Sequence, residues 1–432
     1  MENGYTASKN YSIGEILEKL GNKGNCTPEI AELKRIIDQY MEETENQISL
    51  IKTQIPGNSR IEAMKWIESN VSEELKPYVR KAYFGTLQKG DVLKKRSGKY
   101  KTISEIGVAT VQPDRSKKVK GWMSYWQKEA QKVKEFLENN DTGKPLKIFD
   151  SHCHYYLDSY DGCRDEILDL MKSTGIRHIV MPAVQYLSNY RMIEMQETNG
   201  SKFVHMAYGP CHPKYLWKEI DYWDEDRWEQ FRALIQEHRP VAIGEIGLDY
   251  YSYPDFKDDW DRTMQMNFFI RGIEEANRAE LPAILHIRPV TSTIELPYNT
   301  DQDAIEILRQ HPIKNGAVIH FFMGRPETMK AYMEVGVSYF GIGGMISYGF
   351  KDLIDTVRIM PLESLLLETD SPFVKPFRHY SEGKDDISLS APNTSLSIYE
   401  IALEVSRIRG CSPEEIIEAA YDNALRFFRL QE

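Results

Sequence analysis

The sequence has no run of about 18 apolar residues, which a membrane-spanning helix would require. Its first ten residues, MENGYTASKN, lack the basic and apolar regions of a secretory signal, so we expect a cytoplasmic protein that does not contact a membrane. Cysteine is scarce: the chain has five, none of them in a CxxC spacing. An odd number of widely spaced cysteines excludes a disulfide framework or a zinc ribbon and indicates free thiols.

The composition is that of a globular protein. The 432 residues are 41% hydrophobic and 28% charged, which excludes long disordered, collagen-like or coiled-coil regions. The length exceeds that of one average domain, although a single α/β barrel alone takes up about 250 residues. We therefore expect one large domain with an addition.

The charge is divided unevenly along the chain. The net charge of -11 would argue against a nucleic-acid partner, but residues 1–149 carry a net +6 and residues 150–432 a net -17. Within the first part, the basic segment 76–120 holds 13 Lys and Arg residues and only three acidic residues. This segment is a candidate surface for DNA phosphates, although basic runs are often only solvated.

The first third of the chain predicts a mainly helical extension. Residues 11–80 repeat apolar side chains at helical spacing, and a further helix is expected over 122–140. Between them, 85–121 has short β-branched runs that suit a small ribbon or an irregular connection. The turn-like residues 139–145 mark a change of pattern, so we predict an extension of unknown role over 1–145 and a second domain over 146–432.

Short apolar runs alternate with amphipathic helical patterns through the second domain. There are eight such runs: Lys147–Cys153, Ile176–Pro182, Phe203–Tyr208, Val241–Ile246, Ala283–Ile287, Ala317–Phe321, Val337–Ile342 and Leu365–Thr369. Continuous apolar strands are buried on both faces, and eight strand–helix units predict an α/β fold of the (β/α)8 TIM barrel type. An open doubly wound sheet is the alternative, but the chain lacks a glycine-rich phosphate loop after its first strand.

Acids and histidines follow several of these strands, at the end of a barrel where active sites lie. The first strand ends in Asp-Ser-His-Cys-His, whose period of two points His152 and His154 to the same side. The other candidates are Glu245, His286, His320 and Asp370. Burying four imidazoles and two carboxylates in one cavity is costly unless cations compensate them, so the pattern predicts a site for two divalent ions.

The motifs resemble those of the TatD-like metal-dependent hydrolases, whose best-known members are deoxyribonucleases. The resemblance covers 147–432 and rests on Asp150–His154, Gly209–Pro213, Gly244–Asp249, Gln265–Phe269, His286–Arg288, His320 and Glu368–Pro372. It implies a metal-dependent hydrolase barrel. It also implies that His152, His154 and Asp370 bind one ion, that His286 and His320 bind the other, and that Glu245 bridges them.

The resemblance implies a DNA nuclease or phosphodiesterase that uses two divalent metal ions; it suggests Mg, whereas mixed His and carboxylate ligation suits Mn or Zn. Two adjacent cations would activate a water molecule and stabilise charge on a phosphoryl group, so Asp370 and Glu245 are the candidate catalytic residues. Asp370 would orient the water and accept its proton. His212 and Arg288 are candidate donors to the substrate phosphate, although either could be structural.

Two other functions fit the same residues. The metal chemistry would also suit a hydrolase of a small ester, amide or lactone. A non-catalytic metal-binding interaction protein is the second alternative, with the extension binding a protein partner that the sequence does not identify. A retired enzyme would be free to lose a ligand, however, and all six candidate positions are intact.

Overall fold

The structure is a computed structural model that describes residues 92–94, 100–102 and 116–431, apart from 141–142, 201, 252–258, 290–297 and 378–385. The helices predicted over 11–80 and most of the basic segment 76–120 lie outside the described residues. Before residue 116, the structure describes an antiparallel ribbon of β1 (Val92–Lys94) and β2 (Tyr100–Thr102), which matches the small ribbon predicted there. No helix in the described ranges is long and apolar enough to cross a membrane. The cytoplasmic location stays a prediction.

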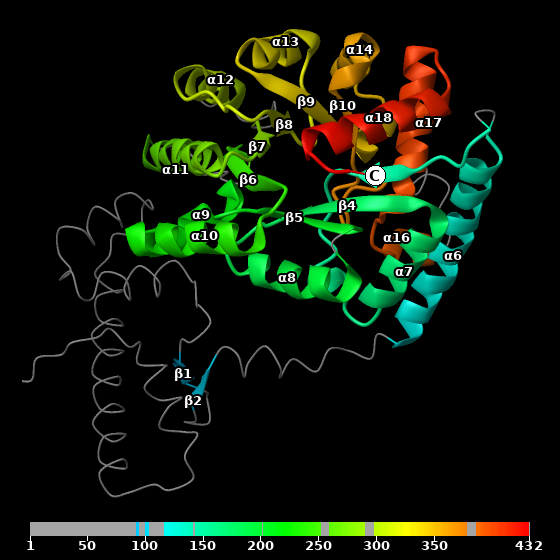
Figure 1. Cartoon of the computed structure of the whole chain (residues 1–432), viewed down its shortest axis with the longest axis horizontal. Coiled ribbons are helices and arrows are strands. Elements are labelled where there is room, and N and C mark those ends of the chain that lie inside the picture. Colours follow the sequence, from blue (N-terminus) through cyan, green and yellow to red (C-terminus); the bar gives the residue numbers. More distant parts are fainter. Residues whose placement is uncertain are drawn as a thin grey trace, which may run out of the picture. The chain divides into compact units, whose positions relative to one another are not determined.

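Eight parallel strands form the barrel (Figure 1). Each pairs with its sequence neighbours, in the order β3 (Ile148–Asp150), β4 (Ile176–Pro182), β5 (Val204–Tyr208), β6 (Ala242–Asp249), β7 (Ala283–Arg288), β8 (Ala317–Ile319), β9 (Val337–Ile342) and β10 (Leu365–Leu367). The first and last strands meet at and just beyond their ends. Ser151 N donates to Leu367 O at 3.1 Å, and the backbones of Cys153 and Ser371 form an isolated parallel β-bridge. These contacts nearly close the sheet, and the predicted TIM barrel is confirmed.

Helices connect successive strands and surround the sheet. They are α6 (Ser116–Glu138), α7 (Arg164–Thr174), α8 (Ser188–Asn199), α9 (Pro213–Glu219), α10 (Glu225–His238), α11 (Asp259–Arg278), α12 (Thr300–Gln310), α13 (Pro326–Glu334), α14 (Lys351–Ile359), α16 (Asp386–Ser390), α17 (Ile398–Arg409) and α18 (Pro413–Phe427). Short 3₁₀ helices are η1 (Asp158–Tyr160), η2 (Ile220–Tyr222), η3 (Gly344–Tyr348), η4 (Leu362–Ser364) and η5 (Ser395–Ser397).

The chain divides into two compact units, residues 1–113 and 114–432. The helix α6 therefore belongs with the barrel, whereas the sequence placed the change of domain near residue 145. Trp122 and Trp126 of α6 are both buried within the barrel unit, which is the reason for this difference. Whether the first unit behaves as a separate domain stays a prediction.

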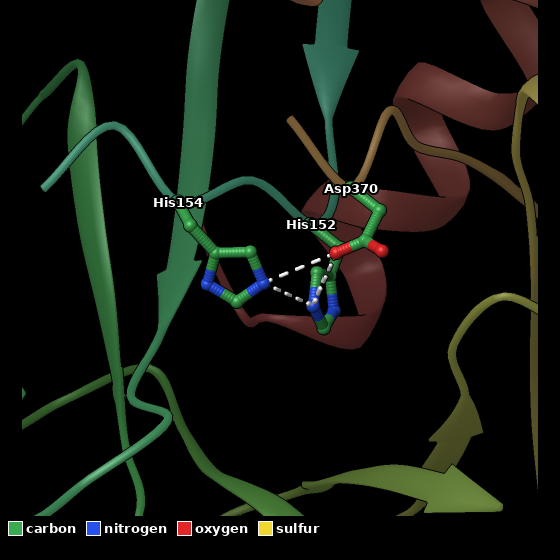
Figure 2. A group of neighbouring side chains, drawn as sticks. All are labelled: His152, His154 and Asp370. Atoms are coloured by element: carbon green, nitrogen blue, oxygen red, sulfur yellow. Dashed lines mark hydrogen bonds and ion pairs between the residues drawn. The ribbon is translucent and has the colours of Figure 1, made fainter. Parts of the chain in front are cut away.

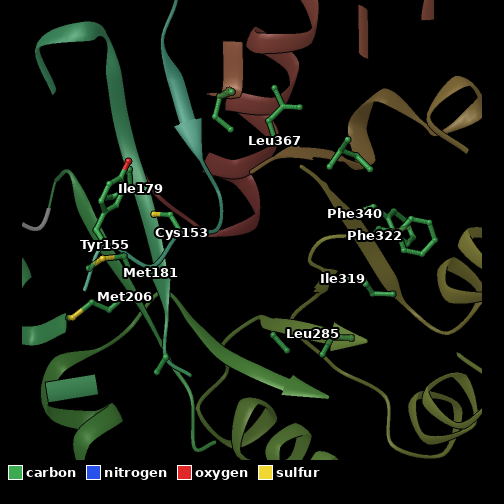
Figure 3. Packing of buried hydrophobic residues seen from close by; sticks show 14 of the residues in the cluster. Cys153, Tyr155, Ile179, Met181, Met206, Leu285, Ile319, Phe322, Phe340 and Leu367 are labelled. Atoms are coloured by element: carbon green, nitrogen blue, oxygen red, sulfur yellow. The ribbon is translucent and has the colours of Figure 1, made fainter. Parts of the chain in front are cut away.

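Alternate residues of each strand pack into two apolar clusters. One cluster takes Val180, Ile284 and Leu366 together with Phe427 and other residues of α18, so it fills the barrel interior and α18 closes one end. The neighbouring strand residues face the surrounding helices; they include Ile179, Leu285 and Leu367 (Figure 3). This interior cluster extends to the end of the barrel that α18 covers, so polar side chains can occupy the opposite end.

Some strands end earlier than the sequence predicted. The runs Ala317–Phe321 and Leu365–Thr369 were expected to be extended throughout, but β8 stops at Ile319 and β10 at Leu367. Beyond these strands, Phe321 and Asp370 adopt positive φ angles of 51° and 50°. A left-handed backbone cannot continue a strand, so the chain turns at the point where the polar residues gather.

A buried pair of histidines near the α18 end of the barrel makes stability depend on pH. His178 Nδ1 lies 3.0 Å from His205 Nε2, and burial, with His178 beside it, lowers the pKa of His205 to about 3. Since an unfolded histidine has a pKa of about 6.5, the unfolded state binds the extra proton first. Above pH 6.5, His205 is neutral in both states and does not change the free energy of unfolding. As the pH falls from 6.5 toward 3, the free energy of unfolding decreases by up to about 1.4 kcal/mol per pH unit.

We therefore expect the melting temperature of the protein to fall more steeply between pH 6.5 and 4.5 than that of His205→Gln, which cannot take up this proton. Thermal denaturation of both proteins in the same metal-free buffers measures the difference. Equal slopes would contradict this account of the pair.

Candidate metal centre

Six side chains predicted from the sequence converge at the carboxyl ends of the strands. Glu245 lies on β6 and His286 on β7. The other four follow the ends of strands: His152 and His154 after β3, His320 after β8 and Asp370 after β10. Four are nearly inaccessible to solvent, whereas His286 and Asp370 are partly exposed. The cluster is therefore a polar layer set on the apolar filling of the barrel.

One group of ligand atoms joins the first and last strands. His152 Nε2 and His154 Nε2 lie 3.2 Å apart, and Asp370 Oδ1 lies 3.1 Å from His154 Nε2 and 3.7 Å from His152 Nε2 (Figure 2). The buried carboxylate of Asp150, the last residue of β3, accepts from His152 N at 3.3 Å and from Thr369 Oγ1 and Ser395 Oγ, each at 2.6 Å. Asp150 thus fixes the ligand group without belonging to it.

A second group lies beside the first, with the His320 ring stacked on that of His152 at 3.9 Å between centroids. His286 Nδ1 and His320 Nε2 are 2.9 Å apart, and Glu245 Oε2 lies 3.4 Å from the first and 3.0 Å from the second. The other carboxylate oxygen, Glu245 Oε1, lies 3.7 Å from the Nε2 atoms of both His152 and His154. Glu245 therefore presents one oxygen to each group.

The donor set fits divalent ions. Four overlapping groups of side chains could each hold an ion: His152, His154 and Asp370; Glu245, His286 and His320; His152, His320 and Glu368; and His212, Asp249 and His286. Glu245 Oε1 is buried and has no hydrogen-bond partner among the described residues. Buried carboxylate oxygens are rarely left in this way, and imidazole and carboxylate are common ligands of Zn²⁺ and Mn²⁺.

The electrostatics of the cluster favour cations. Burial alone would raise the pKa of Glu245, but the surrounding imidazoles, His212 and His320 foremost, lower it well below its usual range. Burial alone would lower the pKa of His320, yet the Glu245 carboxylate raises it well above its usual range. The carboxylates thus attract positive charge strongly enough to offset burial.

Two acids without a predicted role lie behind the histidines, and one of them, Asp249, is within hydrogen-bonding distance of its histidine. Asp249 Oδ2 lies 3.2 Å from His286 Nε2, and Glu368 Oε1 lies 3.7 Å from His320 Nδ1. Carboxylates behind imidazole ligands fix the ring and increase its basicity. Both acids stand within the motifs used above, but spacing alone does not separate a ligand from a residue behind it.

The two candidate substrate-binding residues lie in different surroundings. His212 is buried; its Nδ1 accepts from Lys214 N at 2.9 Å and its Nε2 lies 3.5 Å from Glu245 Oε2. Burial, with His286 close by, lowers the pKa of His212 to about 3, and the side chain lies within the cluster rather than at its rim. Arg288, at the exposed end of β7, stacks its guanidinium 4.0 Å from the ring of Tyr251.

Comparison with known proteins agrees with this geometry. Residues 149–429 match the model of the TatD related DNase family. The uncharacterized metal-dependent hydrolase YabD of Bacillus subtilis is 28% identical over 66% of this chain and 99% of its own length. The human deoxyribonuclease TATDN3 is 26% identical over 65% of this chain and 94% of its own length.

Solved structures show the same fold. The TatD homologue YJJV of Escherichia coli superposes with a TM-score of 0.53 at 24% identity, over 66% of this chain and 98% of its own. The family match covers the whole barrel, and curated relatives are described as metal-dependent hydrolases. The chain therefore belongs to the TatD family of metal-dependent hydrolases.

Proposed function

We propose that this protein is a two-metal hydrolase that cleaves the phosphodiester bonds of DNA. The position of Glu245 carries the proposal, because one of its oxygens faces His152 and His154 and the other faces His286 and His320. His152, His154 and Asp370 would hold one ion and His286 and His320 the other, with Glu245 between them. Divalent Mg, Mn or Zn ions bound there would polarise a water molecule and the phosphoryl oxygens.

In this proposal Asp370 would act as the general base. Its side chain is 18% exposed, whereas that of Glu245 is 2% exposed. A water molecule entering from solvent can therefore reach the Asp370 carboxylate, which would orient it and take up its proton. Arg288 and His212 would donate to the phosphate, and the basic segment 76–120 would contact phosphates along the DNA backbone.

The first test is cleavage of single- and double-stranded DNA by full-length protein loaded with Mn²⁺. Each Lys or Arg contact to a duplex phosphate steepens the fall of log affinity with log salt concentration by about 0.9. For every two such contacts, kcat/KM should therefore fall about tenfold between 50 and 200 mM salt. Intact DNA at low salt, together with hydrolysis of a small ester by the same sample, would overturn the proposal in favour of an acyl substrate.

The role of Arg288 has its own test. Removing a charged donor to phosphate loses binding energy, so Arg288→Ala should raise KM for DNA about tenfold and change kcat less. Arg325→Ala is the matched control, because Arg325 is an exposed arginine whose Nε already donates to Asp352 at 2.8 Å. Equal KM values for the two variants in steady-state kinetics would remove Arg288 from the substrate site.

A further inference from the structure

The helix α6 lies outside the family match, which begins at residue 149, yet it packs against the barrel. Its two tryptophans, Trp122 and Trp126, are 5% and 1% exposed. Figure 1 places α6 beside α7 and α16. An added helix anchored by two buried tryptophans contacts the barrel at specific places, and those places suggest what it does.

Besides α7, α6 contacts the segment that follows β10, described over 368–377 and 386–394 and called the β10 segment below. Trp122 Nε1 donates to Ser390 Oγ at 3.1 Å, and Trp126 Nε1 donates to Pro392 O at 3.3 Å. Lys375 of the same segment lies with its Nζ 6.0 Å from the centre of the Tyr125 ring. The helix thus holds the segment at three separated points.

That segment carries Asp370 at its start and supports it from its end. Asn393 Nδ2 donates to Thr369 O and to Val374 O, both at 3.2 Å, on either side of Asp370. Asn393 N also donates to Pro372 O at 3.1 Å. Since Asp370 stands at a left-handed turn with a φ of 50°, its position depends on these flanking bonds.

Trp126 and Asn393 also line one small cavity, together with Lys375 and Glu400. Lys375 Nζ donates to Ser388 O, so its ammonium lies between α6 and α16, and burial lowers its pKa to about 8. The cavity leaves the hydrogen bond from Trp126 Nε1 to Pro392 O as the direct link, so a movement of Trp126 would shift Pro392 and the adjacent Asn393.

We propose that Trp126 is a positioning residue for Asp370, acting through Pro392 and Asn393. The inference rests on the proposed function in one respect only, that Asp370 is a metal ligand. In this inference α6, which precedes the residues that match the family, helps to position a residue of the candidate active site. The indole ring supplies both the bulk and the donor that fix the end of the β10 segment.

The test is Mn²⁺ binding to the full-length protein, measured by calorimetry with wild type, Trp126→Phe and Leu137→Val. Trp126→Phe keeps an aromatic ring and removes the donor to Pro392. Leu137 is an equally buried residue of the same helix whose side chain contacts Gly175, away from the β10 segment. We expect Trp126→Phe to weaken Mn²⁺ binding and lower kcat by roughly 3- to 10-fold with KM unchanged, and Leu137→Val to do neither.

A double-mutant cycle with Asn393→Ala tests the route. If Trp126 acts through Asn393, the effect of Trp126→Phe on Mn²⁺ affinity should largely disappear in the Asn393→Ala background. Equal Mn²⁺ affinity in wild type and Trp126→Phe, or multiplicative effects of the two changes, would overturn the inference. A wild-type protein that binds no Mn²⁺ would instead overturn the proposed function, so the two failures are distinguishable.

Discussion

Asp370→Asn should lower kcat for DNA cleavage by about 10²- to 10⁴-fold and leave the fold intact. The amide keeps the shape of the side chain but cannot accept the proton of an attacking water, and it is a poorer ligand beside His152 and His154. The Asp370 side chain is 18% exposed, more than those of His152 and His154, so the loss of its charge should shift the melting temperature of the metal-free protein by no more than roughly 4 °C. Steady-state kinetics and thermal denaturation measure the two effects separately.

Glu275→Gln is the control for the loss of a carboxylate as such. Glu275 is as buried as Glu245, but it lies on α11 and pairs with Arg232 at 3.0 Å and with Arg278 at 3.3 Å. Breaking this buried ion pair should lower the melting temperature more than Asp370→Asn does, because Arg232 loses its buried partner and keeps only the exposed Glu225. The activity of the folded protein should remain. Equal losses of kcat in the two variants would indicate a general effect of destabilisation.

Removing divalent ions should abolish activity and lower the melting temperature by about 5–10 °C relative to protein with Mn²⁺ at 100 times its dissociation constant. The reason is the geometry of the donors. Imidazole nitrogens lie 3.2 Å and 2.9 Å apart in the two groups, and Glu245 Oε1 has no hydrogen-bond partner among the described residues. Ions that bind the folded chain satisfy these atoms and stabilise it by mass action.

Glu245→Gln tests where the stabilising ions bind. If Glu245 contacts both ions, this one substitution should remove most of the Mn²⁺-dependent rise in melting temperature and cost as much activity as Asp370→Asn. Differential scanning fluorimetry with chelator and with added Mn²⁺ makes the comparison. A melting temperature that responds to Mn²⁺ equally in wild type and Glu245→Gln would place the ions elsewhere.

Much of the barrel and the convergence of the candidate ligands could be predicted from the sequence because both depend on local patterns. Buried strands such as Ala317–Ile319 and Leu365–Leu367 are continuous apolar runs, and His152 and His154 follow a strand at a spacing of two. Since the carboxyl ends of parallel strands meet at one end of a barrel, ligands from distant strands could be expected to converge.

Features that depend on packing between distant segments could not be predicted. The helix α6 reads as part of the extension because its sequence says nothing about its partners, and its place follows from Trp126 contacting Pro392, 266 residues away. The roles of Asp249 and Glu368 behind the histidines depend on ring orientation, which spacing does not encode. His212 was predicted to bind the substrate. Its Nε2 lies 3.5 Å from Glu245 Oε2, and with Asp249 and His286 it forms one of the groups that could hold an ion.

The central claim is that two cations share the cluster with Glu245 between them. Anomalous diffraction from crystals of the full-length protein grown with Mn²⁺ tests it most directly. We predict two peaks, one bounded by His152, His154 and Asp370 and the other by His286 and His320, with a Glu245 oxygen at each. A single peak, or none within bonding distance of Glu245, would contradict the account.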